Sequence, residues 1–463
     1  MFSVDTYQRR RATLRHQVKN GVLLFLGNID NPINFEHNTY PFRQDSTFLY
    51  YFGIQQAGLA ALIDLDEQRT IVFGDELTMD QIVWMGRQET LREKCAGAGV
   101  GEVLPFGLLT TYLSEAVNKG RVIHYLPPYQ PHNKILLHEL LKQPITSLTG
   151  SVSFIEAVVA QRSIKEEQEL EEIEKAVEVS VEMHLLALRL ARPGMREREI
   201  TNAIQHFAAD RGCPLSYPPI VTVHGEILHN AYQQNHLREG QLLLNDSGAE
   251  TALGYAADLT RTFPVSKRFT SRQREIYDIV HMAFQRANSL LRPGIPFKEV
   301  HVHACESLVE GLISIGLMKG DPKEAVSHHA HTLFFQCGLG HMMGLDVHDM
   351  EDLGEQYVGY TSDEPKDTTT FGLKSLRLGR NLQTGFVLTV EPGIYFIPEL
   401  IDMWQSEHKL QEFINYDKLR DYRDFGGVRI EDNFVITDDG SRRLGPELIH
   451  TADDIEHYKA QHA

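Results

Sequence analysis

The sequence predicts an α/β protein of two domains, the second of which consists of two related halves. The length of 463 residues exceeds what one hydrophobic core usually supports. Short apolar runs alternate with helical segments in the first third of the chain, and a helix–Pro-Gly–helix pattern occurs twice in the remainder. We place the boundary near residue 160, which gives expected domains of residues 1–160 and 161–463.

The first domain contains short apolar runs bounded by turn residues, as buried strands do. Residues 22–27, 60–64 and 69–74 are such runs, and Gly or Asp stands at their ends. Helical stretches lie between them, for example around residues 136–142. This alternation predicts a small α/β domain.

The second domain begins with a long amphipathic helix. A charged segment starts near Ile164, and the apolar positions that follow are three or four residues apart, which marks one face of a helix. The charged positions are its solvated face, and Pro193-Gly194 should end it. The apolar positions are Leu170, Ile173, Val177, Val181, Leu185 and Leu188.

A weak internal repeat follows this helix. Leu-Ala-Arg-Pro-Gly at 190–194 corresponds to Leu-Leu-Arg-Pro-Gly at 290–294, and an amphipathic helix follows each. Strand-like runs come after both helix pairs, at 241–245 in the first half and at 386–390 and 427–436 in the second. The repeat predicts two related half-domains, with a site between them.

Composition excludes several classes of protein. The net charge of −18 argues against nucleic acid as a partner, because polyanions select a surplus of Lys and Arg. The four cysteines form no CxxC pair, which fits a reducing compartment. The N-terminus lacks the apolar segment of a signal peptide, and no apolar run is long enough to span a membrane. We therefore expect a cytoplasmic protein without membrane contact.

Four acids and one histidine each end or follow a strand-like segment. A carboxylate inside an apolar strand is costly unless it is paired or binds a metal. Taken singly, each of these is an ordinary strand-end residue. Together they suit two divalent ions that share bridging carboxylates, and an oxygen-rich set favours hard ions such as Mn²⁺. The five are Asp246, Asp258, His341, Glu391 and Glu431.

The segments around these five residues resemble the pita-bread metallopeptidases, a family that includes methionine aminopeptidase, aminopeptidase P and prolidase. The resemblance covers roughly residues 160–447, and the motifs occur in the family's order. Residues 42–53 also resemble the N-terminal domain of aminopeptidase P and prolidase, which methionine aminopeptidase lacks. The resemblance implies an α+β pita-bread catalytic domain with an internal pseudo-two-fold axis, preceded by a smaller α/β domain.

The resemblance also implies a role for each of the five residues. Asp246 would bind the first metal ion, and Asp258 would bridge both ions. His341 would bind the second ion together with Glu391, and Glu431 would bridge. Manganese is the expected metal, with cobalt or zinc as alternatives.

Two further histidines match positions that act on substrate, and one arginine matches a position that supports the ligands. His229 and His348 would flank the scissile bond, and Arg429 would support the metal ligands. Activated water would attack the carbonyl before proline, with Glu391 as the proton shuttle to the leaving nitrogen. The other histidines, including His328, His329 and His331, we interpret as ordinary structural residues.

The sequence departs from the family pattern in two places. Asp258 follows Asp246 by one position more than is usual, and a hairpin loop near residues 251–253 can absorb the extra residue. Cys337 stands where relatives have the first histidine of His-Gly-Leu-x-His, which lines the proline pocket. A thiol cannot give the same hydrogen bonds, so rate or substrate preference should differ. We interpret Cys337 as a packed, inert cysteine rather than a reactive one.

The sequence is compatible with two hypotheses for substrate length, a dipeptide or a longer peptide. Residues 372–382 look like prolidase, where an arginine matching Arg377 clamps the free carboxylate of a dipeptide. The insertion at 398–425 also looks like prolidase, whereas residues 42–53 fit either enzyme. We favour an Xaa-Pro dipeptidase over an aminopeptidase P, with short proline-containing peptides as substrates and a homodimer as the expected assembly.

Two other classes of function fit the sequence less well. Some pita-bread proteins have lost their ligands and only bind partners, but all five ligand types remain here. A nucleotide-binding loop is excluded, because Gly344 stands one residue too far along the chain for a GxGxxG motif after Gly338 and Gly340.

Overall fold

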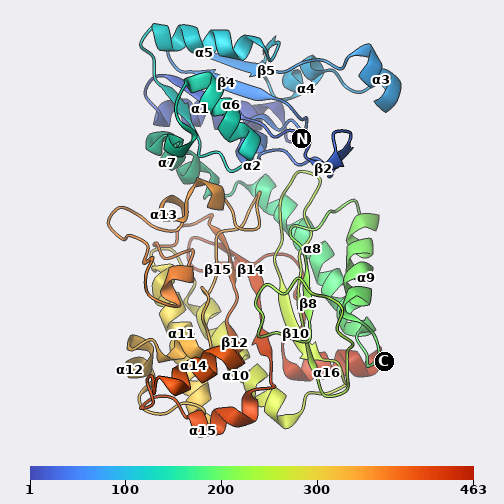
Figure 1. Ribbon diagram of the computed structural model, residues 1–463, viewed down its shortest axis with the longest axis vertical. Helices are drawn as coiled ribbons and strands as arrows, with labels where there is room; N and C mark the ends of the chain where they lie inside the picture. The colour runs from blue at the N-terminus through green and yellow to red at the C-terminus, as the bar shows by residue number, and fades with distance from the viewer. Residues whose placement is uncertain (463) are drawn as a thin grey trace. The chain divides into compact units, whose positions relative to one another are not determined.

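The computed structural model describes residues 1–462, which divide into two compact units. Unit 1 comprises residues 1–162 and 350–357. Unit 2 comprises residues 163–349 and the described residues from 358 onward. The chain is a mixed α/β protein with a smaller N-terminal unit, and the segment 350–357 enters unit 1 from within the second half of the sequence (Figure 1).

Unit 1 is built on a five-stranded mixed sheet with the strand order β6-β5-β4-β1-β7. The interior strand β1 (Val22–Leu26) pairs antiparallel with β4 (Ala60–Asp64), the middle strand, and parallel with β7 (Ile123–Tyr125). β5 (Arg69–Phe73) and β6 (Glu102–Leu104) complete the sheet, and β2 (Pro32–Phe35) and β3 (Asn38–Thr39) form a separate ribbon. The helices are α1 (Val4–Gln17), α2 (Ser46–Phe52), α3 (Met79–Met85), α4 (Leu91–Gly97), α5 (Leu108–Asn118), α6 (Pro131–Leu141) and α7 (Val152–Arg162), with the 3-10 turns η1 (Ile145–Ser147) and η3 (Glu351–Leu353).

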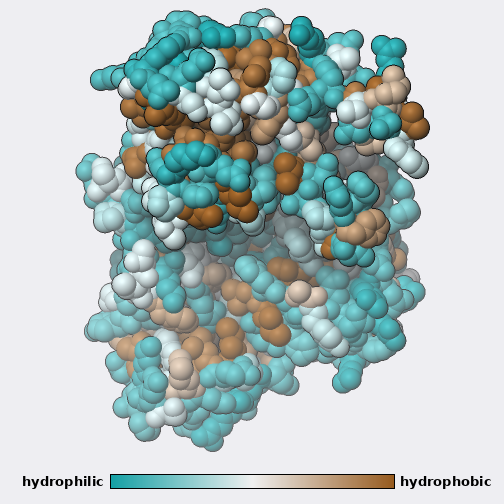
Figure 2. Space-filling model, turned by 45° about the horizontal axis from the view of Figure 1, so that its top comes forward, coloured by the Kyte–Doolittle hydropathy of each residue, from teal (hydrophilic) through white to brown (hydrophobic). Residues whose placement is uncertain are grey.

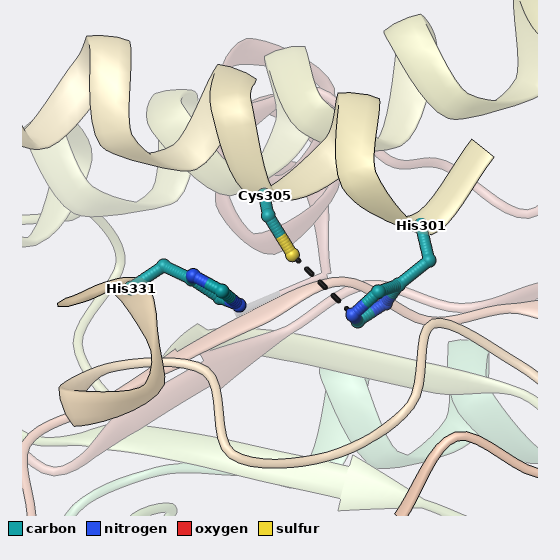
Figure 3. A group of neighbouring side chains, drawn as sticks. All are labelled: His301, Cys305 and His331. Atoms are coloured by element: carbon teal, nitrogen blue, oxygen red, sulfur yellow. Dashed lines mark hydrogen bonds between the residues drawn. The ribbon is translucent and has the colours of Figure 1, made fainter. Parts of the chain in front are cut away.

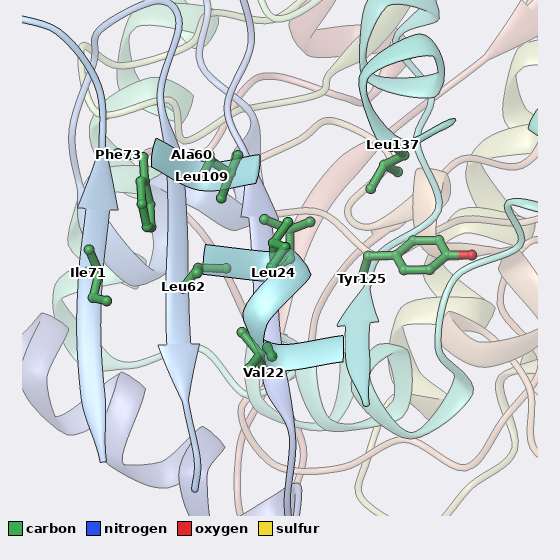
Figure 4. Close-up of a cluster of buried hydrophobic side chains, with 11 residues drawn as sticks. Val22, Leu24, Ala60, Leu62, Ile71, Phe73, Leu109, Tyr125 and Leu137 are labelled. Carbon is green, nitrogen blue, oxygen red and sulfur yellow. The ribbon is translucent and has the colours of Figure 1, made fainter. Parts of the chain in front are cut away.

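Both faces of this sheet are covered, which explains the continuous apolar runs of its strands. On one face Val22 and Leu24 belong to a cluster with Leu109 of α5 and Leu137 of α6 (Figure 4). On the other face the ring of Phe25 lies 5.3 Å from Tyr51 and 5.1 Å from Phe154, which belong to α2 and α7. The alternation of side chains along β1 therefore supplies two separate packing layers.

The surface carries apolar side chains that no described residue covers (Figure 2). The most exposed lie on α3, where Met79, Val83 and Trp84 are 72%, 73% and 87% exposed. Across residues 1–462, no helix has both the length and the apolar character that a membrane crossing requires.

Unit 2 contains the sheet β10-β9-β8, the sheet β11-β14-β15 and the pair β12-β13. The strands are β8 (Ile220–Thr222), β9 (Leu242–Asp246), β10 (Thr260–Pro264), β11 (Val387–Val390), β12 (Gly393–Tyr395), β13 (Gly427–Arg429), β14 (Asp432–Ile436) and β15 (Ser441–Arg443). The helices are α8 (Glu167–Leu190), α9 (Glu197–Asp210), α10 (Ser271–Leu290), α11 (Phe297–Ser314), α12 (Pro322–Ser327), α13 (Glu355–Val358, at the border of the units), α14 (Pro398–Ser406), α15 (Tyr416–Leu419) and α16 (Ala452–Gln461). Short 3-10 turns are η2 (Ala330–Leu333), η4 (Leu373–Ser375) and η5 (Arg420–Tyr422).

The sequence repeat is a structural repeat. Gly194 and Gly294 end the turns after α8 and α10, both with positive φ, of 94° and 85°. The amide of Gly194 donates to the carbonyl of Leu237, and that of Gly294 donates in the same way to Leu382. In each half, the same glycine hydrogen bond therefore joins the turn after the long helix to a segment later in the chain. This equivalence confirms the predicted pseudo-two-fold symmetry.

A backbone bridge joins the two halves of unit 2 at Glu431. The amide of Glu431 donates to the carbonyl of Thr260 over 3.0 Å, which joins the segment between β13 and β14 to β10. The run 427–436, expected as one strand, is thus interrupted at Ile430 and Glu431. The interruption sets Glu431 beside the other half.

Candidate functional site

The five residues that the sequence singled out converge on the seam between the two halves of unit 2. Asp246 is the last residue of β9, Asp258 lies just before β10, and Glu391 follows β11. The ring Nε2 of His341 lies 3.4 Å from Asp258 Oδ2 and 3.7 Å from Glu391 Oε1. Asp258, His341 and Glu431 each bring one ligand atom to within 4.8 Å of the other two.

Two residues hold the carboxylate of Asp246 from outside this group. The Arg429 guanidinium pairs with Asp246 Oδ2 and also donates to the Tyr395 hydroxyl over 3.0 Å. The Tyr217 hydroxyl lies 2.6 Å from Asp246 Oδ1 and 2.5 Å from Asp258 Oδ1. Tyr217 therefore bridges the two aspartates and fixes their separation.

Glu431 has one satisfied and one unsatisfied oxygen. The hydroxyl of Thr260 donates to its Oε2 over 2.6 Å, and Arg429 Nε donates to the same hydroxyl oxygen. Its Oε1 is buried and has no hydrogen-bond partner among the described residues. Burying an unpartnered carboxylate oxygen is costly, so this atom fits a cation ligand.

The ring orientation of His341 also fits a cation. Its Nδ1 lies 3.1 Å from the carbonyl oxygen of Met342, an acceptor, so Nδ1 carries the proton. A neutral ring then turns the Nε2 lone pair toward carboxylates of Asp258 and Glu391. Lone pairs facing lone pairs repel unless a cation lies between them, and a second hydrogen bond through Nδ1 is typical of histidines that bind metals.

The electrostatics of the carboxylates and His341 also indicate a cation-binding site. Burial raises the pKa of Asp258, Glu391 and Glu431 well above their usual values, and the neighbouring carboxylates raise them further. Among the residues that the structure describes, the guanidinium that forms an ion pair with one of these four acids is that of Arg429. The cluster lacks positive charge, and oxygen-rich ligands with one imidazole suit divalent cations. The residues present therefore fit the two-ion centre.

The two predicted substrate-handling histidines lie near this group. His348 packs edge-on against His341 with the ring centroids 4.3 Å apart. Its loop is anchored by a buried ion pair of 2.8 Å between Lys165 and Asp349. His229 is exposed, and its pKa is lowered by partial burial and then by the charges of Arg429, Arg377 and His348.

Arg377 and Cys337 also lie near the acids. Burial raises the pKa of Glu391, the predicted proton shuttle, and the charge of Arg377 is a smaller, opposing influence on it. Burial raises the pKa of the Cys337 thiol to about 12, and the Glu391 carboxylate adds to the rise. The thiol is therefore protonated at neutral pH, in keeping with an inert cysteine.

Sequence reasoning missed the residues that support the acids. Tyr217 stands among prolines in a loop before β8, and Thr260 and Tyr395 lie within strands. No spacing or periodicity marks any of them, because their role depends on contacts across the seam. The Ser-Tyr-Pro-Pro run at 216–219 predicts only a turn.

Comparisons with known proteins agree with this geometry. The model of metallopeptidase family M24 matches residues 171–438, and that of the aminopeptidase P N-terminal domain matches residues 7–124. The chain is 30% identical to the Xaa-Pro aminopeptidase of Escherichia coli, with 98% of this chain and 97% of that protein covered. It is 31% identical to the Xaa-Pro dipeptidase of Rattus norvegicus, with 87% and 82% covered. The structure of E. coli aminopeptidase P with the inhibitor Pro-Leu superposes with a TM-score of 0.81 at 29% identity, covering 100% of this chain and 99% of that one.

Proposed function

The chain belongs to metallopeptidase family M24, and from that premise we propose that it hydrolyses the peptide bond between an N-terminal residue and proline. The observation that carries the proposal is the convergence of four carboxylates and one imidazole at the seam of unit 2. Curated relatives named for Xaa-Pro hydrolysis support the substrate class.

We assign the metal ligands as the sequence predicted them. Asp246 would bind one ion, Asp258 and Glu431 would bridge, and His341 with Glu391 would hold the other. When bound, two divalent cations supply the Lewis acidity that makes water nucleophilic near neutral pH. Manganese is the proposed metal, because the ligands are mostly oxygen.

The remaining residues act on the substrate. His348, which packs against His341, and the exposed His229 would donate hydrogen bonds to the carbonyl oxygen as it gains charge. Glu391 would pass a proton to the proline nitrogen, which has no hydrogen of its own and must be protonated to leave. Burial raises the pKa of Glu391, which helps this carboxyl to hold a proton for transfer.

We propose further that the substrate is a dipeptide. The charge of Arg377 acts on both Glu391 and His229, the proposed proton shuttle and a proposed substrate-binding histidine. A guanidinium in this position can bind a carboxylate with two parallel hydrogen bonds. In a dipeptide the C-terminal carboxylate follows the scissile bond directly, so one arginine can measure substrate length.

The test is a kinetic comparison of Arg377→Ala with wild type. Loss of a charged hydrogen-bonding partner should raise KM for Xaa-Pro dipeptides by roughly 10–100-fold, while KM for Xaa-Pro-Yaa tripeptides changes little. Lys374→Ala removes an exposed positive charge from the same loop and is the matched control. Equal effects on dipeptides and tripeptides would contradict the carboxylate clamp.

Aminopeptidase P is the second candidate. It is favoured by the E. coli relative, which this chain covers over almost its whole length. A panel of Xaa-Pro, Xaa-Pro-Yaa and Xaa-Ala peptides with added Mn²⁺ distinguishes the two. Higher kcat/KM for tripeptides than for dipeptides would establish the aminopeptidase and leave the metal centre assignment intact.

A homodimer and a cytoplasmic location belong to the same proposal. The four cysteines are free thiols, which fits a reducing compartment. Light scattering of the purified chain tests the dimer, and fractionation of its native cells tests the location.

A further inference from the structure

A second group of metal-binding side chains lies in unit 2, apart from the carboxylates. His301 and Cys305 are four residues apart on α11 and so share one face of the helix. His331 comes from η2, and its ring points toward the other two (Figure 3). One ligand atom from each lies within 4.8 Å of the other two, and all three residues are buried.

The measured spacing is that of two ligands on one ion. The Nε2 of His301 lies 3.5 Å from the Sγ of Cys305. Zinc bonds of about 2.0 Å to nitrogen and about 2.3 Å to sulfur, at a tetrahedral angle, separate the two ligand atoms by about 3.5 Å. Histidine pairs four residues apart on a helix bind zinc by the same arrangement.

The hydrogen bonding of these rings differs from that of a packed core histidine. His184 is as deeply buried, and its Nε2 and Nδ1 contact the Ser247 carbonyl and the Asn245 amide, each over 3.0 Å. Among the described residues, neither ring nitrogen of His331 makes a hydrogen bond, and Nδ1 of His301 makes none either. Leaving a buried imidazole unpartnered costs roughly 1–3 kcal/mol, so the His331 ring fits a ligand that is not a protein group.

We propose that His301, Cys305 and His331 bind one zinc ion as a structural site, independent of the hydrolytic centre. Two imidazoles and a thiolate select a borderline-soft ion, unlike the carboxylate set. Burial lowers the pKa of His301 to about 4 and that of His331 to about 3, so both rings are in the neutral form that binds metals. Binding converts the Cys305 thiol to a thiolate, and the proton passes to solvent.

The site would join two elements that no backbone ladder joins. It ties α11 to η2, which is followed after Leu333 by the segment that leads through Cys337 to His341. The ion would thus hold the start of the segment that carries a ligand of the hydrolytic centre. The competing reading is a single S–H···N hydrogen bond between Cys305 and His301, with His331 packed beside it.

Cobalt distinguishes the two readings, because a Co²⁺–thiolate bond gives an intense near-ultraviolet charge-transfer band and carboxylate ligands give none. The full-length chain is stripped with a chelator and titrated with Co²⁺. We expect one Co²⁺ per chain to develop the band, and Zn²⁺ to abolish it. Wild type saturated with Co²⁺ but lacking the band would overturn the proposal, and this result needs no variant to fold.

Three variants identify which residues bind the ion. Cys305→Ser should lose the band, and His331→Gln should weaken the affinity for zinc by at least about 100-fold. Cys337→Ser is the matched control, because its thiol interacts electrostatically with that of Cys305 and lies nearer the carboxylates. If Cys337→Ser lost the band and Cys305→Ser kept it, the thiolate that binds Co²⁺ would be that of Cys337. This result would reject the proposed site.

Discussion

The carboxylate group and the histidine–cysteine group lie in the same unit, and each brings three ligand atoms within 4.8 Å, but they are built in opposite ways. The carboxylate group is surrounded by oriented partners, such as Tyr217, Thr260 and Arg429. The histidine–cysteine group has almost none: among the described residues, the buried Nδ1 atoms of His301 and His331 make no hydrogen bond, and the ring of Phe335 lies 5.7 Å from that of His301.

This difference indicates that the carboxylate group suits a reaction and the histidine–cysteine group suits a structural role. Oriented partners hold charged ligands in one geometry and tune their basicity, as a reacting centre requires. A dry, neutral group needs only the ion itself, as a structural site requires. His184, with both ring nitrogens hydrogen-bonded, shows the third case of a histidine that needs no metal.

Asp258→Asn is expected to have the largest effect. The residue lies within reach of His341 and Tyr217, and an amide cannot replace an anionic bridging ligand. Hydrolysis of an Xaa-Pro substrate should fall on the order of 10³-fold in kcat/KM. The cobalt–thiolate band should remain, whereas Cys305→Ser should show the reverse pattern of kept activity and lost band. One variant that removed both signals without unfolding would show that the two groups are a single centre.

The sequence predicted the carboxylate group much better than the histidine–cysteine group. Each acid lies at or beside the end of a strand, and five motifs in family order marked the set. In the second group, no prediction was made from His301 and Cys305, and His331 was interpreted as an ordinary structural residue. Its approach to α11 depends on the turn of η2, where His329 adopts a φ of 60°. Local patterns cannot give such a tertiary approach, and for the same reason Tyr217 was missed.

Fold prediction succeeded where the periodicity was long and failed at interruptions. The steps of three and four after Leu170 gave the long helix α8, and the apolar run before Asp246 gave β9. The break at Glu431 could not be read from an apolar run, because it arises from the bridge to Thr260 in the other half.

His184 should govern part of the acid stability. Burial lowers its pKa to about 4, from about 6.5 in the unfolded chain. Between these values the unfolded state binds the extra proton, so stability falls as pH drops from about 6.5 toward 4. One such proton contributes about 1.4 kcal/mol per pH unit, or about 3 kcal/mol in all.

Urea unfolding at several pH values measures this slope. His184→Gln should flatten it, whatever its effect on absolute stability near neutral pH. His206→Gln, whose side chain is 77% exposed, is the control and should leave the slope unchanged. If the pH dependence of the unfolding free energy were unchanged in His184→Gln, His184 would not be the buried, neutral histidine that the comparison with His331 assumes.

Removing zinc should lower thermal stability by an intermediate amount. An ion held at about 100 times its dissociation constant adds about 2.7 kcal/mol, which corresponds to about 5 °C or more in Tm. The measurement compares Asp258→Asn with Asp258→Asn/Cys305→Ser, so that the hydrolytic centre is disabled in both. A chelator should lower Tm only in the chain that keeps Cys305. Equal shifts would place the stabilising ion elsewhere.

Tyr217→Phe should have the smallest effect of the four, and it tests whether oriented partners distinguish the two groups. The hydroxyl touches Asp246 and Asp258 at 2.6 and 2.5 Å but contributes no ligand of its own to the predicted set. Partners of this kind are typically worth 10–100-fold in metal affinity or activity. We therefore expect Mn²⁺ to be needed at roughly 10–100-fold higher concentration for half-maximal hydrolysis, with kcat at saturating Mn²⁺ reduced less. Tyr232→Phe, at a side chain 59% exposed, should change neither quantity. If Tyr217→Phe lowered kcat at saturating Mn²⁺ and left the half-maximal concentration unchanged, the hydroxyl would act on substrate instead of holding the two aspartates for the cations.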